Sequence, residues 1–197
     1  MSTPTFQLIR QAREQSYRLS AAEATKLHQN IQKAVQFHVP DRDDMHEAVH
    51  LGNALIVQTI IQSPKLNADQ KANLADVGLL AWAQNPLGSR ESAKIVQALA
   101  SFAHKELRTP KGETIAETFA SSLGRMEIQE QEQANKRNLS TPSSAASTVH
   151  LKEAWKALEE AGVDLGKAKD IRQQARAPKV FTITRQAPTP SSGFKPS

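Results

Sequence analysis

The stretch DDMHEAVHLGNALIVQTIIQ, residues 43–62, decides the fold of this chain. Its apolar residues Met45, Val49, Ile56 and Ile60, with Gly52 between them, stand three or four positions apart. At about 100° per residue these positions fall on a single stripe of a helix. The stretch therefore predicts one amphipathic helix that ends at about residue 62, because a proline follows two positions later.

The same helical spacing recurs on both sides of that stretch. It predicts further helices over residues 5–19, 21–39, 68–84 and 89–107, and a sixth that begins near residue 113. Strand patterns are nearly absent from this part of the chain, and the loops are short, so neighbouring helices are expected to be antiparallel. Residues 1–138 are thus predicted to form an all-α, six-helix bundle.

The chain changes character after the sixth predicted helix. Residues 139–149 contain the run LSTPSSAAST, whose small polar residues are typical of a flexible linker. Residues 150–177 predict a short helical segment. Residues 178–197 predict an extended or disordered basic tail, in which KVFTITR, residues 179–185, is the one possible short strand.

The bulk composition bounds the class of protein. Hydrophobic residues make up 39% and aromatic residues 5%, and the mean hydropathy is −0.51, so the core must be built mainly from aliphatic side chains and alanine. The absence of cysteine excludes disulfides and thiolate zinc sites. The sequence contains neither a membrane-length apolar run nor a secretory signal, which predicts a cytoplasmic protein. Export by a route that needs no such signal stays open.

The pattern His46-Glu47-Ala48-Val49-His50 matches H-E-x-x-H, the motif of zinc metallopeptidases. Two histidines four apart on a helix can share a zinc ion, and the intervening glutamate can act as general base on the bound water. Glu47 would be the catalytic residue of that alternative, and His46 and His50 would be the zinc ligands.

Three features weigh against the peptidase alternative. The sequence offers no third ligand at the spacing of the known motif families, since no glutamate occurs between Glu47 and Glu91. It also predicts no strand beside the motif helix. On that helix the two histidines fall at the flank of the apolar stripe, and Glu47 is expected to point away from the core. We therefore expect neither a zinc cofactor nor catalysis, and interpret the histidines as boundary residues.

The segment LKEAWKALEEAGVDLGKAKDIRQQAR, residues 151–176, loosely resembles small helix–loop–helix modules such as SAP-type DNA-binding domains. It departs from their pattern because Gly162 and Gly166 lie one residue too close. The resemblance implies DNA binding. The excess of basic residues from Lys167 onward is compatible with phosphate contacts, although few aromatic residues accompany them for base stacking.

A third interpretation of the carboxy-terminal segment is recognition of a partner protein. Three apolar residues share one face of the short predicted helix, basic residues follow, and the possible strand could pair with the edge of a sheet. This interpretation explains apolar residues that a merely solubilising tail would not need. The residues predicted to bind the partner are Leu151, Trp155, Leu158, Lys167, Lys169, Arg172, Phe181 and Ile183.

These patterns together favour a non-catalytic α-helical adaptor or scaffold that binds partner proteins through its carboxy-terminal segment, as a component of a larger bacterial or phage assembly. The first alternative is a zinc metallopeptidase that uses the H-E-x-x-H motif. The second is a nucleic-acid-binding accessory protein that acts through the basic segment.

Overall fold

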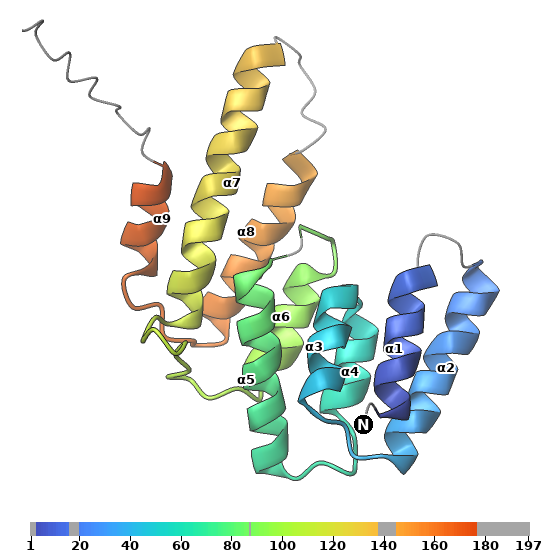
Figure 1. Cartoon of the computed structure of the whole chain (residues 1–197). Helices are drawn as coiled ribbons and strands as arrows, with labels where there is room; N and C mark the ends of the chain where they lie inside the picture. Colours follow the sequence, from blue (N-terminus) through green and yellow to red (C-terminus); the bar gives the residue numbers. More distant parts are fainter. Residues whose placement is uncertain (1–2, 16–19, 87, 138–144, 177–197) are drawn as a thin grey trace, which may run out of the picture.

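The computed structural model describes residues 3–15, 20–86, 88–137 and 145–176, and these residues form an all-α fold (Figure 1). The prediction of the fold class is confirmed. The helices of the described residues are α1 (Pro4–Gln15), α2 (Ala21–Phe37), α3 (Arg42–Leu51), α4 (Ala54–Ile61), α5 (Ala68–Gln84), α6 (Ser92–Ala100), α7 (Ile115–Arg137), α8 (Ala145–Glu160) and α9 (Ala168–Arg176). The tail residues after 176 lie outside this set.

Local capping chemistry sets several helix starts. Ser20 and Glu23 form the capping box of α2, and Asn67 and Gln70 form the corresponding pair in α5. In each box the first side chain accepts a hydrogen bond from a backbone N–H of the first turn, and the second side chain accepts one from the cap residue. Such signals are readable in the sequence, and α5 spans residues 68–84 as predicted.

The prediction of one continuous helix over residues 43–62 is wrong, because the chain breaks it at Gly52 and Asn53. Gly52 ends α3 in the left-handed conformation, with φ of 72°. Asn53 then caps α4, and its side-chain oxygen accepts hydrogen bonds from the backbone N–H groups of Leu55 and Ile56. A glycine after the last turn and an asparagine before the next are ordinary stop and start signals. They outweigh the apolar stripe that runs across the junction.

Helix α6 ends at Ala100, earlier than the predicted 107, because a carboxylate of α5 binds the chain that follows. The Asp76 Oδ1 atom accepts the backbone N–H of His104 at 3.0 Å, and Asp76 Oδ2 lies 2.7 Å from His104 Nδ1. The segment then turns through Gly112, whose φ is 81°, and α7 begins with a capping box between Thr114 and Glu117. Between these helices, Arg108 and Thr114 form an isolated antiparallel bridge.

One hydrophobic core runs through the described residues and includes α8 and the start of α9. Its aromatic members form a chain across three helices. The ring centroids of Trp82 and Phe119 are 4.4 Å apart, and those of Phe119 and Trp155 are 6.1 Å apart. Helix α8 packs against α6 and α7, and α9 packs against α7 (Figure 1). The segment predicted as an appendage to the bundle is therefore packed into it.

The predicted linker of residues 139–149 overlaps the first turns of α8, which starts at Ala145. Thr148 explains part of this difference, because its side chain is buried and its hydroxyl donates a hydrogen bond to the Glu130 carboxylate of α7. This contact joins residues 18 positions apart. None of the helices in the described ranges is long and apolar enough to span a membrane.

Candidate functional site

An open depression of about 460 Å³ lies between α8 and α9. On α9, the lining residues follow one face of the helix, at spacings of three, four and seven positions. On α8 they stand four positions apart. The residues that line it are Trp155, Glu159, Lys169, Arg172, Gln173 and Arg176. We call this depression the α8–α9 groove.

The Trp155 indole forms the apolar part of the groove but is itself only 6% exposed. The Arg172 guanidinium lies over its ring, with the central carbon 5.3 Å from the ring centroid. This is the geometry of a cation–π contact, which contributes about 0.5–1 kcal/mol at sites that are not fully desolvated. The indole thus holds the side chain of α9 against α8, and little of its own surface is left for a ligand.

Glu127 of α7 binds basic residues of both helices that border the groove. Its side chain is 7% exposed and accepts hydrogen bonds from Arg172 Nη2 at 2.7 Å and from Arg172 Nε at 3.3 Å. Arg176 Nε lies 3.3 Å from the same carboxylate, and Lys152 Nζ lies 3.6 Å from it. Three cations share one carboxylate, so positive charge is left over at the groove.

The pKa of Glu127 is lowered from its ordinary value. Burial on its own raises this pKa, because it penalises the ionised form. The hydrogen bond from Arg172 and the positive charges of Arg172, Arg176 and Lys152 together outweigh that burial. Glu127 therefore stays ionised at neutral pH and holds α8 and α9 to α7.

A second glutamate of α7 fixes the start of α9. Glu117 Oε1 accepts the backbone N–H of Lys167 at 2.9 Å, and Oε2 accepts the backbone N–H of Thr114 at 2.7 Å. These two backbone hydrogen bonds lower the pKa of Glu117. The approach is close: a Cβ atom at Gly166, where φ is 48°, would lie 2.7 Å from Glu117 Oε1. The left-handed backbone conformation favours glycine there, and a larger residue would also have to displace the Glu117 carboxylate.

The structure separates the predicted partner-binding residues into two groups. Leu151, Trp155 and Leu158 are buried, because α6 and α7 cover the face that they share. A partner could reach that face only if α8 left the bundle. The cover comes from other helices, so the amphipathic pattern of α8 alone could not reveal it. Whether these three residues bind a partner stays a prediction.

The predicted basic residues lie at the surface. Lys167 and Lys169 are exposed and Arg172 is half-buried. Of these three, Lys169 and Arg172 line the groove together with Trp155. Phe181 and Ile183 lie outside the described residues.

Sequence reasoning missed the groove residues Glu159, Gln173 and Arg176 as a set. The one-face spacing on residues 167–176 was a readable signal for the last two. No signal in the sequence pointed to Glu127 or Glu117, since each meets α9 across at least 45 positions of chain.

The H-E-x-x-H segment lies on α3, where the two histidines meet. His46 Nε2 and His50 Nε2 are 3.2 Å apart. The expectation that Glu47 points away from the core is wrong, because it is 8% exposed and its Oε2 atom lies 2.6 Å from Arg13 Nη1 of α1. Helix α1 packs on the side of α3 that the residue spacing had predicted to face solvent. The residues the structure describes contain no group of three or more metal-binding side chains.

Comparison of the chain with protein-family models, with curated proteins and with solved structures found no match in any of the three. The functional argument therefore depends on the chemistry of the described residues alone.

Proposed function

We propose that the protein is a non-catalytic helical adaptor that binds an acidic segment of a partner protein in the α8–α9 groove. The observation that carries this proposal is the convergence of Lys152, Arg172 and Arg176 on the single carboxylate of Glu127. The groove thus has a local excess of positive charge. Asp170, the one acid of α9, is not among its lining residues.

The groove chemistry suits a peptide that carries carboxylates. Lys169 is exposed on one side of the groove, and Arg176 Nε contacts Glu127 while its side chain is 57% exposed. Gln173 offers an amide that can donate to and accept from a peptide backbone. Because the charges are exposed, they would mainly accelerate association and set specificity rather than supply most of the affinity.

One feature favours a protein over a nucleic acid as the ligand. Glu159 lines the groove, but it is paired with Lys169 at 3.3 Å and would act alike on carboxylates and on phosphates. The Trp155 ring is covered by Arg172 and nearly buried, so it offers no face on which a base could stack. An acidic peptide needs only one or two cations and a hydrogen-bonding side chain.

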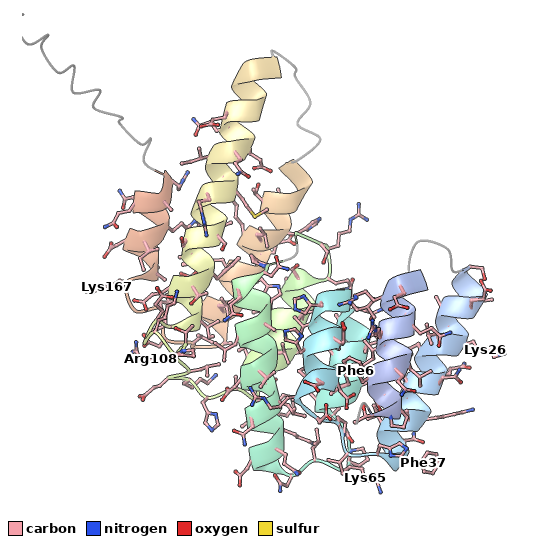
Figure 2. The ribbon with its side chains drawn as sticks, in the orientation of Figure 1. Phe6, Lys26, Phe37, Lys65, Arg108 and Lys167 are labelled. Atoms are coloured by element: carbon pink, nitrogen blue, oxygen red, sulfur yellow. The ribbon has the colours of Figure 1, made fainter. Side chains whose placement is uncertain are left out.

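The test uses the full chain and a fluorescein-labelled poly-glutamate peptide, with fluorescence anisotropy as the readout. The variant Lys169→Glu/Gln173→Glu reverses the groove charge without touching the Glu127 network. We expect it to weaken peptide binding by about tenfold, as for two unfavourable exposed charge pairs. The control Lys26→Glu/Gln29→Glu makes the same chemical changes on α2. Figure 2 shows Lys26 at the opposite side of the molecule from Lys167 at the start of α9.

The outcomes separate the candidates. Equal loss of peptide binding in the groove variant and in the control would contradict the proposal, because net charge alone would then govern binding. A duplex DNA oligonucleotide serves as the second probe. If DNA binds with an affinity that falls steeply with salt, and the peptide does not bind, the nucleic-acid alternative replaces the adaptor proposal.

A further inference from the structure

The histidine pair of α3 is arranged as a chelating unit. His46 and His50 stand one helical turn apart, with ring centroids 4.3 Å apart and ring planes at 64°. Their Nε2 atoms are separated by 3.2 Å. Two metal–nitrogen bonds of about 2.0–2.1 Å that meet at about 90–110° hold their nitrogens about 2.9–3.4 Å apart. The two nitrogens therefore already lie at the separation that one metal ion requires.

Helix α3 holds this arrangement firmly. At its start, Asp41 and Asp44 form a capping box, and at its end Gly52 takes the left-handed conformation. Met45 and Val49, on the adjacent face of the helix, are buried in the core. Because the ligand spacing is set by the helix itself, binding requires only small rotations of two side chains. The chain is thus preorganised for a bidentate contact.

The surroundings leave both imidazoles able to bind. His46 is exposed and His50 is half-buried, so an ion can approach from solvent. The neighbouring Glu47 and Arg13 are paired with each other, with Glu47 Oε2 at 2.6 Å from Arg13 Nη1. The Glu47 carboxylate is therefore engaged and is not counted as a ligand.

We propose that His46 and His50 form a two-histidine chelating site for a late first-row divalent cation, with water on the remaining coordination positions. Imidazole nitrogen favours Cu²⁺, Ni²⁺ and Zn²⁺ over the hard cations Mg²⁺ and Ca²⁺, and Cu²⁺ is expected to bind most tightly. Two ligands give a site that loads and empties readily, unlike a four-ligand structural zinc site. The inference is independent of the adaptor proposal, because α3 and the α8–α9 groove share no residue.

The experiment is a calorimetric titration of the full chain, without a polyhistidine tag, with NiCl₂ at pH 7.5. We expect one Ni²⁺ per chain, and a dissociation constant about tenfold larger in His46→Ala, because a single imidazole loses the chelate partner. His50→Ala should show the same loss. His38→Ala is the matched control: it removes an exposed histidine that caps α2, and it should bind as the parent does. MgCl₂ should give no binding signal.

Three results would overturn the inference. The parent protein and His46→Ala could bind Ni²⁺ equally. His38→Ala could weaken binding as much as His46→Ala, which would mean that any histidine suffices. The ion could also resist removal by a chelator in the parent, which would require further protein ligands and a different site. His46→Ala is the decisive variant, because its exposed side chain can be removed without disturbing the core.

Discussion

Buried glutamates are paired with cations in different ways in the amino-terminal and carboxy-terminal helices. In the first region, Glu47 of α3 meets the single cation Arg13 of the neighbouring α1. In the second, Glu127 of α7 gathers cations from both α8 and α9, and Glu117 caps the start of α9. Helix α9 has only nine residues and is too short to be stable alone. The comparison teaches that α9 depends on two glutamates far away in the sequence, whereas α3 is fixed by its own caps.

The largest expected effect tests whether both regions share one core. Trp155→Ala should lower the free energy of unfolding by about 3–5 kcal/mol, because it empties a nearly buried site beside Phe119. Trp82→Ala on α5 should cost a similar amount. Urea denaturation followed by circular dichroism measures both. A loss below about 1 kcal/mol at Trp155 would mean that α8 is not part of the cooperative core.

The next effect isolates the carboxylate that holds α9. Glu127→Gln keeps the shape of the side chain but removes the charge that three cations share, and should cost about 1–3 kcal/mol. Amide hydrogen exchange should accelerate selectively in α9. Glu160→Gln is the control, because its pair with Lys156 at 3.4 Å is exposed and should contribute about 0–1 kcal/mol. If Glu127→Gln and Glu160→Gln lowered the free energy of unfolding equally, the conclusion that Glu127 holds α9 in place would be contradicted.

The pH dependence of stability sharpens the comparison. The pKa values of Glu117 and Glu127 are lowered, so their contribution is present above the ordinary value of 4.5 and is lost as the pH falls through the lowered values. Asp44 of α3 acts in the opposite direction, because burial raises its pKa. Its stabilising contribution is therefore present at low pH and is lost as the pH rises.

Urea denaturation between about pH 6 and about pH 3 measures these slopes. The double variant Glu117→Gln/Glu127→Gln should lose less stability in acid than the parent protein does. Asp44→Asn should lose more, since it removes a group that favours folding as the pH falls. An unchanged slope in the double variant would show that neither glutamate holds α9 through its charge.

The smallest expected effect concerns the histidine pair. Without metal, His46→Ala should change the free energy of unfolding by less than about 1 kcal/mol, because the side chain is exposed and its polar contact is with the neighbouring His50. Thermal denaturation in the presence of a chelator gives the value. A larger loss would mean that the contact between the rings stabilises α3, and would weaken the interpretation of the pair as a ligand site.

The presence of a helix could be predicted wherever the apolar spacing and the capping residues indicated the same segment, as in α5. The break between α3 and α4 was also readable, since Gly52 and Asn53 are common stop and start residues. The stripe through residues 43–62 concealed it, because periodicity counts residues and does not register the backbone conformation at one glycine. The early end of α6 was less accessible, because it depends on the Asp76 carboxylate 28 positions away.

Some of the residues that line the α8–α9 groove could be predicted from the sequence. The basic residues and Trp155 were chosen from the sequence, since charge and helical spacing are local properties. The convergence of Lys152, Arg172 and Arg176 on the Glu127 carboxylate could not be predicted, because these residues lie on different helices.

The sequence by itself determined the helical class, several helix boundaries such as those of α5, and the one-turn spacing of His46 and His50. These follow from backbone geometry, capping and residue periodicity, which act within a few positions of the chain. The tertiary structure alone decided that α8 buries Leu151, Trp155 and Leu158 within the chain, and that Glu47 faces Arg13. The physical reason is that an amphipathic face requires cover but does not specify its source. Only packing among helices distant in sequence selects which surfaces are covered and which remain free to bind.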